Sequence, residues 1–414
     1  MPVALRARLG LLFYLQYFAF GAWFVPLGAY MSKGLGFDAY IGYAYAGQGV
    51  ATILSTLLVG MIADRVLAPE RVLTILLVLS GAALLALPEA HSIQVFLPVL
   101  FLAFLFFIPT IAIANAVCLH WLSDPATEFP KLRVLGTVGW ISSGLAIGSL
   151  QSAAASALPL LIGGGVNLAL AVYTMTLPRT HGLIAERPRT LRAVFGLDLV
   201  DETTDRSFFV LLAAALLITL SAAFYYAYAN TFLLEAGVTI NWAGWTLEAT
   251  AIQSLGQASE LLFLLLLPVC LRVFGMKGVF MLGIASWLLR CLLFAAGYHP
   301  GGSGLWLLVI GVLLHGAAND FVQVAGQIYV DRALGPNARA RAQALFTTVI
   351  MGVGAVLGSF LANMIYTANT DAAGRHNWST IWLVPAGLAL GTLIWFWMAF
   401  RPGRAIGDVA EIPY

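Results

Sequence analysis

Long apolar runs recur along almost the whole chain and constrain it more than any other feature. Each run approaches or exceeds the roughly 20 residues that an α-helix needs to cross a bilayer. Charged residues make up only 10% of the 414 residues and hydrophobic residues 61%, whereas soluble domains carry about 25% charged residues. A soluble protein of this length could not cover its surface with so few charges. The sequence therefore predicts an all-α integral membrane protein with lipid around most of the chain.

The apolar runs number twelve, and basic residues are distributed unequally between the loops that join them. The runs lie near residues 9–31, 38–63, 71–89, 93–121, 133–153, 157–177, 207–234, 243–271, 277–297, 304–330, 342–366 and 379–400. An even number of spans puts both termini on one side, and 18 of the 21 lysines and arginines fall on that side. Cytoplasmic loops carry such an excess. We therefore expect both termini in the cytoplasm and a multi-pass protein of the plasma membrane, in bacteria the inner membrane.

The longest polar segment divides the predicted helices six and six. It predicts an N-terminal six-helix bundle at 1–177, a cytoplasmic linker at 178–206, and a C-terminal six-helix bundle with a short cytoplasmic tail at 207–414. An amphipathic stretch is expected in the linker around 191–199.

The two halves also echo each other in sequence. The pair Gly47-Gln48 recurs as Gly256-Gln257, and the run GLAIGS at 144–149 has the counterpart GAVLGS at 354–359. The offsets are 209 and 210 residues. Parallel repeats of this kind occur in transporters, although glycines four residues apart also serve close helix packing.

Between the second and third runs stands the sequence GMIADRVLAPER, residues 60–71. It resembles the loop signature of the major facilitator superfamily, a glycine followed by an Asp-Arg pair and a further basic residue. Gly60 would permit close helix approach, and Asp64 could cap a helix or pair with a cytoplasmic arginine. With Arg65 and Arg71, these residues are predicted to form a latch that favours the outward-facing state. The alternative is a charged turn that obeys the positive-inside rule.

Six further runs, in order along the chain, resemble the nucleoside:proton symporter family of that superfamily. They are LQYFAFGAW (15–23), FPKLRVLGTVGW (129–140), NTF (230–232), QASE (257–260), WLLR (287–290) and HGAANDF (315–321). The resemblance covers nearly the whole chain. It implies the major facilitator fold, with twelve transmembrane helices in two six-helix halves. It also implies a secondary active transporter that imports nucleosides with protons by alternating access around a midplane site.

The same resemblance implies roles for individual residues. In the fifth apolar run it assigns substrate binding to Arg133, Thr137 and Trp140. In the eighth run it assigns substrate binding to Gln257 and Glu260.

Some positions depart from the best-known members of that family. Amides in the seventh run are replaced by Ala223 and Tyr226, and two aromatics in the tenth run are replaced by His315 and Asn319. These positions are expected to face the substrate, so Tyr226, His315 and Asn319 join the predicted substrate-binding residues. The departures leave open another hydroxylated solute, such as a sugar or a modified nucleoside.

Four ionisable residues lie deep inside apolar runs, where such groups are costly and are candidates for function. Glu260 shares a helix face with Gln257, and it is predicted to bind substrate and carry a proton unless an arginine pairs with it permanently. Asp320, the acidic residue that the resemblance places in the tenth run, is the second proton-coupling candidate unless Arg290 neutralises it as a structural partner. His315, with an intrinsic pKa of about 6.5, suits proton passage or a hydrogen-bonded core position.

Aromatic residues crowd the seventh run, at Phe224, Tyr225, Tyr226 and Tyr228. One or two of them could stack on a flat base. Lipid-facing positions are the alternative for the others.

Several functions find no support in the sequence. No metal-ligand cluster, phosphate-binding loop or catalytic triad is evident, so we expect no cofactor, no metal and no enzymatic activity. The net charge is only +2. The sequence has no basic stripe interleaved with aromatics, the pattern that nucleic acid binding requires. A proton-independent facilitator and a sensor that binds without transport remain alternatives. We expect a monomer whose partners are a small solute, the proton and the lipid bilayer.

Overall fold

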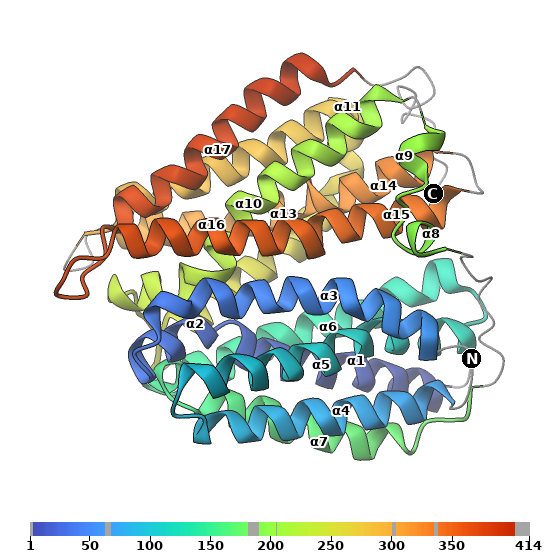
Figure 1. Ribbon diagram of the computed structural model, residues 1–414, viewed down its shortest axis with the longest axis horizontal. Helices are drawn as coiled ribbons and strands as arrows, with labels where there is room; N and C mark the ends of the chain where they lie inside the picture. The colour runs from blue at the N-terminus through green and yellow to red at the C-terminus, as the bar shows by residue number, and fades with distance from the viewer. Residues whose placement is uncertain are drawn as a thin grey trace. The chain divides into compact units, whose positions relative to one another are not determined.

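Helices account for nearly all of the regular structure in the computed structural model, which describes residues 3–62, 68–180, 190–203, 205–299, 304–334 and 338–401 (Figure 1). The chain divides into two compact units. The first comprises Met1–Arg187 and Thr239–Ser254, and the second comprises Pro188–Val238 and Leu255–Tyr414.

The first unit contains seven labelled helices and a small hairpin. The helices are α1 (Val3–Phe24), α2 (Leu27–Ala29), α3 (Ile41–Ile62), α4 (Pro69–Ala86), α5 (Ile93–Trp121), α6 (Pro125–Gly148) and α7 (Leu158–Thr174). The strands β1 (Ile240–Trp242) and β2 (Trp245–Leu247) pair antiparallel, with Trp242 opposite Trp245. The two residues of the turn, Ala243 and Gly244, have positive φ angles of 50° and 83°, as a tight two-residue hairpin requires.

Helix α1 packs along α6 and α7, and α4 packs along α5 and α7 (Figure 1). Glycine permits the closest of these contacts, because a Cβ atom added to Gly139 of α6 would lie 2.1 Å from the carbonyl oxygen of Tyr14 in α1. Small residues bring transmembrane helices together in this way. A buried polar contact joins α1 to α5, where Nε2 of Gln16 donates to Oγ1 of Thr110 at 2.9 Å.

The second unit contains the remaining helices, except that the first residues of α11, up to Ser254, belong to the first unit. They are α8 (Leu191–Val194), α9 (Leu199–Glu202), α10 (Arg206–Glu235), α11 (Ala249–Gly297), α12 (Leu305–Leu313), α13 (His315–Asp320), α14 (Gln323–Ala333), α15 (Arg339–Thr347), α16 (Ala355–Ala368) and α17 (Trp378–Ala399). Helix α10 packs against α16 and α17. Helix α11 has 49 residues and leaves the helical conformation at Gly275, where φ is 64°. A straight helix of that length would measure about 74 Å, more than twice the bilayer core, so the break divides α11 into two arms.

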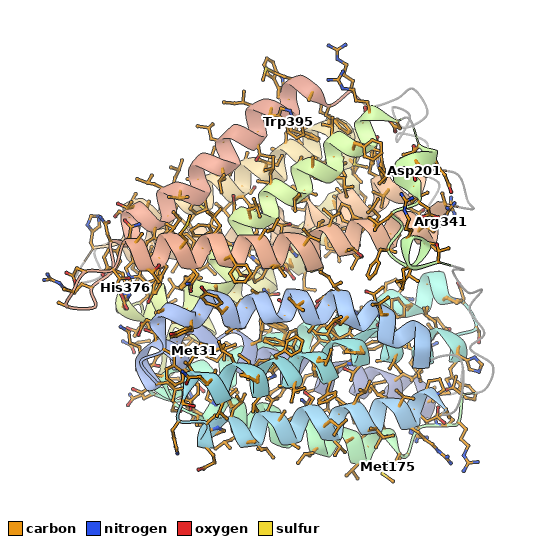
Figure 2. All side chains as sticks on the ribbon, in the orientation of Figure 1. Met31, Met175, Asp201, Arg341, His376 and Trp395 are labelled. Atoms are coloured by element: carbon orange, nitrogen blue, oxygen red, sulfur yellow. The ribbon has the colours of Figure 1, made fainter. Side chains whose placement is uncertain are left out.

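Two polar clusters lie at opposite ends of the second unit, marked by His376 at one end and by Arg341 and Asp201 at the other (Figure 2). At the first end, Glu235 of α10 accepts hydrogen bonds from Nδ1 of His376 at 3.0 Å and from Nε1 of Trp378 at 2.6 Å. His376 also stacks on Tyr366 with ring centroids 4.5 Å apart. These contacts fasten the loop between α16 and α17 to the end of α10.

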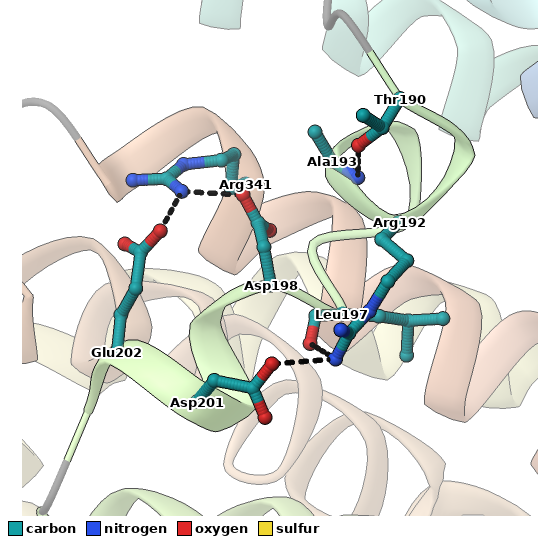
Figure 3. A network of polar contacts seen from close by, with 8 residues as sticks. All are labelled: Thr190, Arg192, Ala193, Leu197, Asp198, Asp201, Glu202 and Arg341. Atoms are coloured by element: carbon teal, nitrogen blue, oxygen red, sulfur yellow. Dashed lines mark hydrogen bonds and ion pairs between the residues drawn. The ribbon is translucent and has the colours of Figure 1, made fainter.

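At the other end, the short helices α8 and α9 are held by ion pairs (Figure 3). Nη1 of Arg341 in α15 donates to Asp198 at 2.5 Å and to Glu202 at 2.9 Å. Gly196 lies directly against the backbone of Arg341, since an added Cβ would come within 2.1 Å of its carbonyl oxygen. The stretch predicted around 191–199 thus contains the short helix α8 and ends where α9 begins.

Within the described residues, eight helical segments are long and apolar enough to cross a membrane. They are Val3–Gly34, Pro69–Glu89, Ile93–Trp121, Arg206–Glu235, Ala249–Gly297, Leu305–Ala333, Arg339–Ala368 and Trp378–Ala399. The chain is therefore an all-helical membrane protein, and the exact number of twelve spans stays a prediction.

Candidate functional site

The tenth predicted span is not one continuous helix, and its interruption shapes the polar core of the second unit. Helix α12 ends at Leu313, and α13 begins at His315. The last carbonyl groups of a helix have no partner within it. Here the carbonyls of Gly311 and Val312 accept hydrogen bonds from Arg290 of α11, at 2.8 Å from Nε and 3.3 Å from Nη2.

Arg290 is completely buried, and its third polar contact is with the imidazole of His315. Nη1 of Arg290 lies 3.0 Å from Nδ1 of His315. The guanidinium carbon lies 3.7 Å from the ring centroid of Tyr225 and 4.9 Å from that of Trp287. Aromatic faces attract a desolvated cation, so these two rings help to stabilise the buried charge.

His315 connects this arginine to a carboxylate. Its Nε2 atom lies 3.0 Å from Oε1 of Glu260 in α11. The same carboxylate oxygen accepts a hydrogen bond of 3.0 Å from Nδ2 of Asn319, one turn further along α13. Tyr226 of α10 extends the chain, because its hydroxyl lies 3.5 Å from Oδ1 of Asn319. A hydrogen-bonded chain therefore runs through Arg290, His315, Glu260, Asn319 and Tyr226, which we call the polar chain.

Small residues let α11 approach α12 and α13 closely enough for these contacts. A Cβ on Gly256 would lie 3.0 Å from the Cβ of His315, and a Cβ on Gly316 would lie 2.5 Å from the carbonyl oxygen of Ser259. The backbone N–H of Gly316 donates to Oγ of Ser259 at 3.0 Å. The repeat motif that includes Gly256 thus has a packing role, which brings Glu260 within reach of His315.

Asp320 lies outside the polar chain. It ends α13 and is 5% exposed, and its buried Oδ2 atom has no hydrogen-bond partner among the described residues. Pairing with Arg290 was the structural alternative for Asp320, and among the described residues the guanidinium instead contacts His315 and the carbonyls of Gly311 and Val312.

Three predicted substrate residues lie in the first unit, all on α6. Nη2 of Arg133 donates to the hydroxyl of Tyr17 at 2.5 Å, and its guanidinium lies 4.1 Å from that ring centroid. Thr137 is half-buried. Trp140, also half-buried, meets Phe20 edge to face with ring centroids 5.4 Å apart.

The other predicted residues fall at varied places. Gln257 is half-buried on α11, one turn before Glu260. Of the predicted latch, Gly60 lies within α3, Arg71 is exposed in the first turn of α4, and Asp64 and Arg65 lie outside the described residues.

Comparison with known proteins decides the family. The family described as Nucleoside H+ symporter matches residues 3–405. The chain belongs to this family. Among its relatives, the xanthosine permease of Escherichia coli (strain K12) is 34% identical over 414 residues, covering 96% of each chain. The nucleoside permease NupG of the same organism is 31% identical over 412 residues, again covering 96% of each chain.

Solved structures agree with this membership in the nucleoside H+ symporter family. The crystal structure of nucleoside transporter NupG aligns with a TM-score of 0.86 at 28% identity, covering 96% of this chain and 100% of that chain. The POT family transporter PepTSo aligns with a TM-score of 0.73 at 14% identity, covering 96% of this chain and 98% of that chain, which shows a shared fold alone. The nucleoside H+ symporter family is one of transporters, so the chain is a multi-pass membrane carrier and not an enzyme.

Sequence reasoning missed two parts of the site in this family member. Tyr225 stacks on His315 with centroids 5.0 Å apart and lies beside the Arg290 charge, whereas the sequence suggested it only as one of four aromatics that could stack on a base. Ser259 joins α11 to α13 through Gly316. The crowding of aromatics in the seventh span was a signal for Tyr225, and the QASE run contains Ser259.

Proposed function

We propose that this chain is a secondary active transporter that imports nucleosides together with protons by alternating access. Membership of the nucleoside H+ symporter family supports this function. The observation that carries it is the carboxylate of Glu260, which receives hydrogen bonds from His315 and Asn319 inside a bundle of membrane-spanning helices. Burial of an ionisable group in a membrane costs free energy, so such a group is a candidate for function.

The proposed substrate residues share a polar or aromatic side chain that suits the hydroxyls and base edge of a nucleoside. They are Arg133, Thr137, Trp140, Tyr226, Gln257, Glu260, His315 and Asn319. Amide, carboxylate and guanidinium groups supply both donors and acceptors. The aromatic rings supply faces for a flat base.

Glu260 and Asp320 are the proposed proton-coupling residues. Both belong to α-helices of the second unit, and the buried Oδ2 of Asp320 has no hydrogen-bond partner in the described part of the chain. A buried carboxylate without donors is costly while it is charged, and protonation removes that cost. Binding of a proton would therefore let the loaded carrier change conformation, so that the inward proton gradient drives accumulation.

We propose a topology of twelve spans with both termini in the cytoplasm of a bacterial cell and a monomeric carrier in the inner membrane. The two arms of α11 count as separate spans, and α3, α6 and α7 add three to the long apolar segments. The proposed domains remain 1–177, 178–206 and 207–414. The latch of Gly60, Asp64, Arg65 and Arg71 remains a proposal.

Uptake of labelled uridine, adenosine or xanthosine into proteoliposomes tests this function. With an imposed inward proton gradient, we expect nucleoside to accumulate above the outside concentration, and dissipating the gradient should abolish accumulation. Uptake that is equal with and without the gradient would leave a facilitator in place of a symporter.

A carrier of another hydroxylated solute is the second candidate. It is favoured by His315 and Asn319, which bind Glu260 at positions where the best-known members of the resembled family carry aromatics. A thermal-shift screen of nucleosides against sugars separates the two, because a ligand that binds the folded state raises the melting temperature. We expect nucleosides to raise it and sugars to leave it unchanged.

A further inference from the structure

The guanidinium of Arg290 can only donate hydrogen bonds, and this determines the state of the imidazole that it contacts. Each nitrogen of arginine carries hydrogen, and none accepts a bond. Since Nη1 of Arg290 lies 3.0 Å from Nδ1 of His315, Nδ1 must be the acceptor and carry no proton. The neutral imidazole then carries its proton on Nε2, and that nitrogen lies 3.0 Å from Oε1 of Glu260.

A second proton on His315 is opposed by the same neighbour. It would place an N–H at Nδ1 against the N–H of Arg290 and add a positive charge beside a buried guanidinium, and both changes are unfavourable in a dry interior. The groups that face His315 are Arg290 and Glu260 from α11 and Tyr225 and Tyr226 from α10, while Asp320 lies five residues further along its own segment. Among these groups, only the Glu260 carboxylate favours a charged imidazole, and it already accepts a hydrogen bond from the Nε2 proton of the neutral imidazole.

Arg290 is held in place independently of His315. Its Nε and Nη2 atoms bind the carbonyls of Gly311 and Val312 near the end of α12. In a continuous helix the N–H of Gly316 would bind the carbonyl of Val312, but here it donates to Ser259 at 3.0 Å. The guanidinium is therefore a fixed part of the bundle, and it orients the imidazole.

We propose that Arg290 is a positioning residue for Glu260, because it locks His315 in the tautomer with the proton on Nε2 and makes His315 a permanent donor to the carboxylate. His315 then does not carry the transported proton. The inference rests on the proposed function, in which Glu260 binds substrate and a proton. It decides between the two roles that the sequence left open for His315.

The test measures the pH profile of nucleoside uptake by the full-length protein in proteoliposomes. In the wild type, His315 does not titrate, and the profile should show no step from an imidazole. In Arg290→Met, Nδ1 loses its donor and can take up a proton. We therefore expect a new step at about pH 6 to 7, the ordinary range of imidazole, together with a rise in KM of roughly tenfold, the effect of losing one charge-assisted hydrogen bond.

A double-variant cycle shows whether Arg290 acts through His315. The variant His315→Phe should lack the new step, and the double variant Arg290→Met/His315→Phe should lack it too. Arg272→Met changes an exposed arginine in the other arm of α11 and should keep the wild-type profile. A step that persists in the double variant, or an Arg290→Met profile identical to the wild type, would overturn the proposal.

A second pair of variants leaves Arg290 in place and so does not depend on the folding of Arg290→Met. A glutamine at 315 can accept from Arg290 and donate to Glu260, whereas a phenylalanine can do neither. Because His315 is itself a proposed substrate residue, both variants can raise the KM, and we expect the KM of His315→Phe to be roughly tenfold higher than that of His315→Gln. Equal KM values in both would overturn the proposal. Wild-type uptake that ignores an imposed proton gradient would instead overturn the proposed function itself, and this inference with it.

Discussion

Glycine 316 shows how single residues control the site. Its backbone lies so close to α11 that an added Cβ would meet the carbonyl oxygen of Ser259 at 2.5 Å and the amide nitrogen of Glu260 at 2.7 Å. These are backbone atoms, which cannot move aside without shifting a helix. The spacing between Glu260 and its donors therefore depends on the absence of a side chain at this position.

We expect Gly316→Ala to lower the free energy of unfolding by about 1 to 3 kcal/mol, the usual cost of overpacking, and to reduce nucleoside uptake. The control is Gly387→Ala in α17, where an added Cβ meets nothing within 4 Å. Because alanine favours helix over glycine by up to about 1 kcal/mol, the control should be neutral or slightly stabilising. Thermal unfolding of the purified variants measures both effects, and equal melting temperatures would contradict the packing role.

The sequence identified most residues of the polar chain but not their connections. Glu260, His315, Asn319 and Tyr226 were predicted to face a substrate, and the structure joins them by hydrogen bonds. For Arg290 the sequence suggested Asp320 as a possible partner, whereas the structure shows a contact with His315. Sequence spacing places His315 and Asp320 in the same segment, and it does not tell which of them an arginine from α11 contacts.

At the scale of elements, the ion pairs on Arg341 hold α8 and α9 to α15 (Figure 3). The Arg341 and Asp198 side chains are 27% and 25% exposed, and Glu202 is 53% exposed. Partial exposure and screening limit such pairs, so we assign them about 1 kcal/mol together. They fix the end of the linker to the second unit.

The variant Arg341→Ala should release α8 and α9 and speed limited proteolysis between residues 190 and 206. Arg339→Ala is the matched control, because Arg339 lies in the same helix but contacts Asp331 of α14, through its backbone carbonyl at 3.2 Å and its carboxylate at 3.8 Å, and not α8 or α9. We expect the control to be cleaved at the wild-type rate. Equal cleavage of both variants would show that the ion pairs do not hold the segment.

The loop between α16 and α17 has a pH-dependent contact. The carboxylate of Asp371 accepts a hydrogen bond of 2.9 Å from the backbone N–H of Arg375 and one of 2.8 Å from Nε of its guanidinium. These two bonds, the backbone bond more than the guanidinium bond, lower the pKa of Asp371 below its ordinary value. A carboxyl with a lowered folded-state pKa stabilises the fold above its unfolded pKa, about 3.9, and this effect is lost as the pH falls through the folded value.

We therefore expect Asp371→Asn to lower the melting temperature slightly at pH 7 and to have no effect once the pH lies below the folded pKa. The Asp371 carboxylate is exposed, so the shift should be small. Thermal unfolding across pH 3 to 7 measures it. A difference that grows as the pH falls would contradict the assignment.

Apolar length and charge predicted where helices lie better than how they begin and end. Each predicted run contains a helical segment, because burial in lipid requires internal backbone hydrogen bonds. The β1–β2 hairpin was not predicted, and the run expected from residue 243 begins as α11 at Ala249. Nor does hydrophobicity mark the π-helical turns at Tyr30–Gly34 and Thr348–Gly354, since they depend on local packing.

At the scale of the whole molecule, the polar chain predicts a substrate range. The polar chain offers a carboxylate, an amide and a phenol together, which suits solutes with several hydroxyls and a base edge. In a competition assay against labelled uridine, other nucleosides should reduce uptake strongly and sugars weakly. Stronger competition by a sugar than by nucleosides would favour the second candidate function, a carrier of another hydroxylated solute.

The central claim is that neutralisation of a buried carboxylate couples the proton to the solute. Its most direct test is accumulation of a nucleoside against its own gradient in proteoliposomes, driven by an imposed proton gradient, for the wild type and for Glu260→Gln/Asp320→Asn. We predict that the wild type accumulates nucleoside, and that the double variant equilibrates it without accumulation and still exchanges it in counterflow. Accumulation by the double variant equal to that of the wild type would contradict the account.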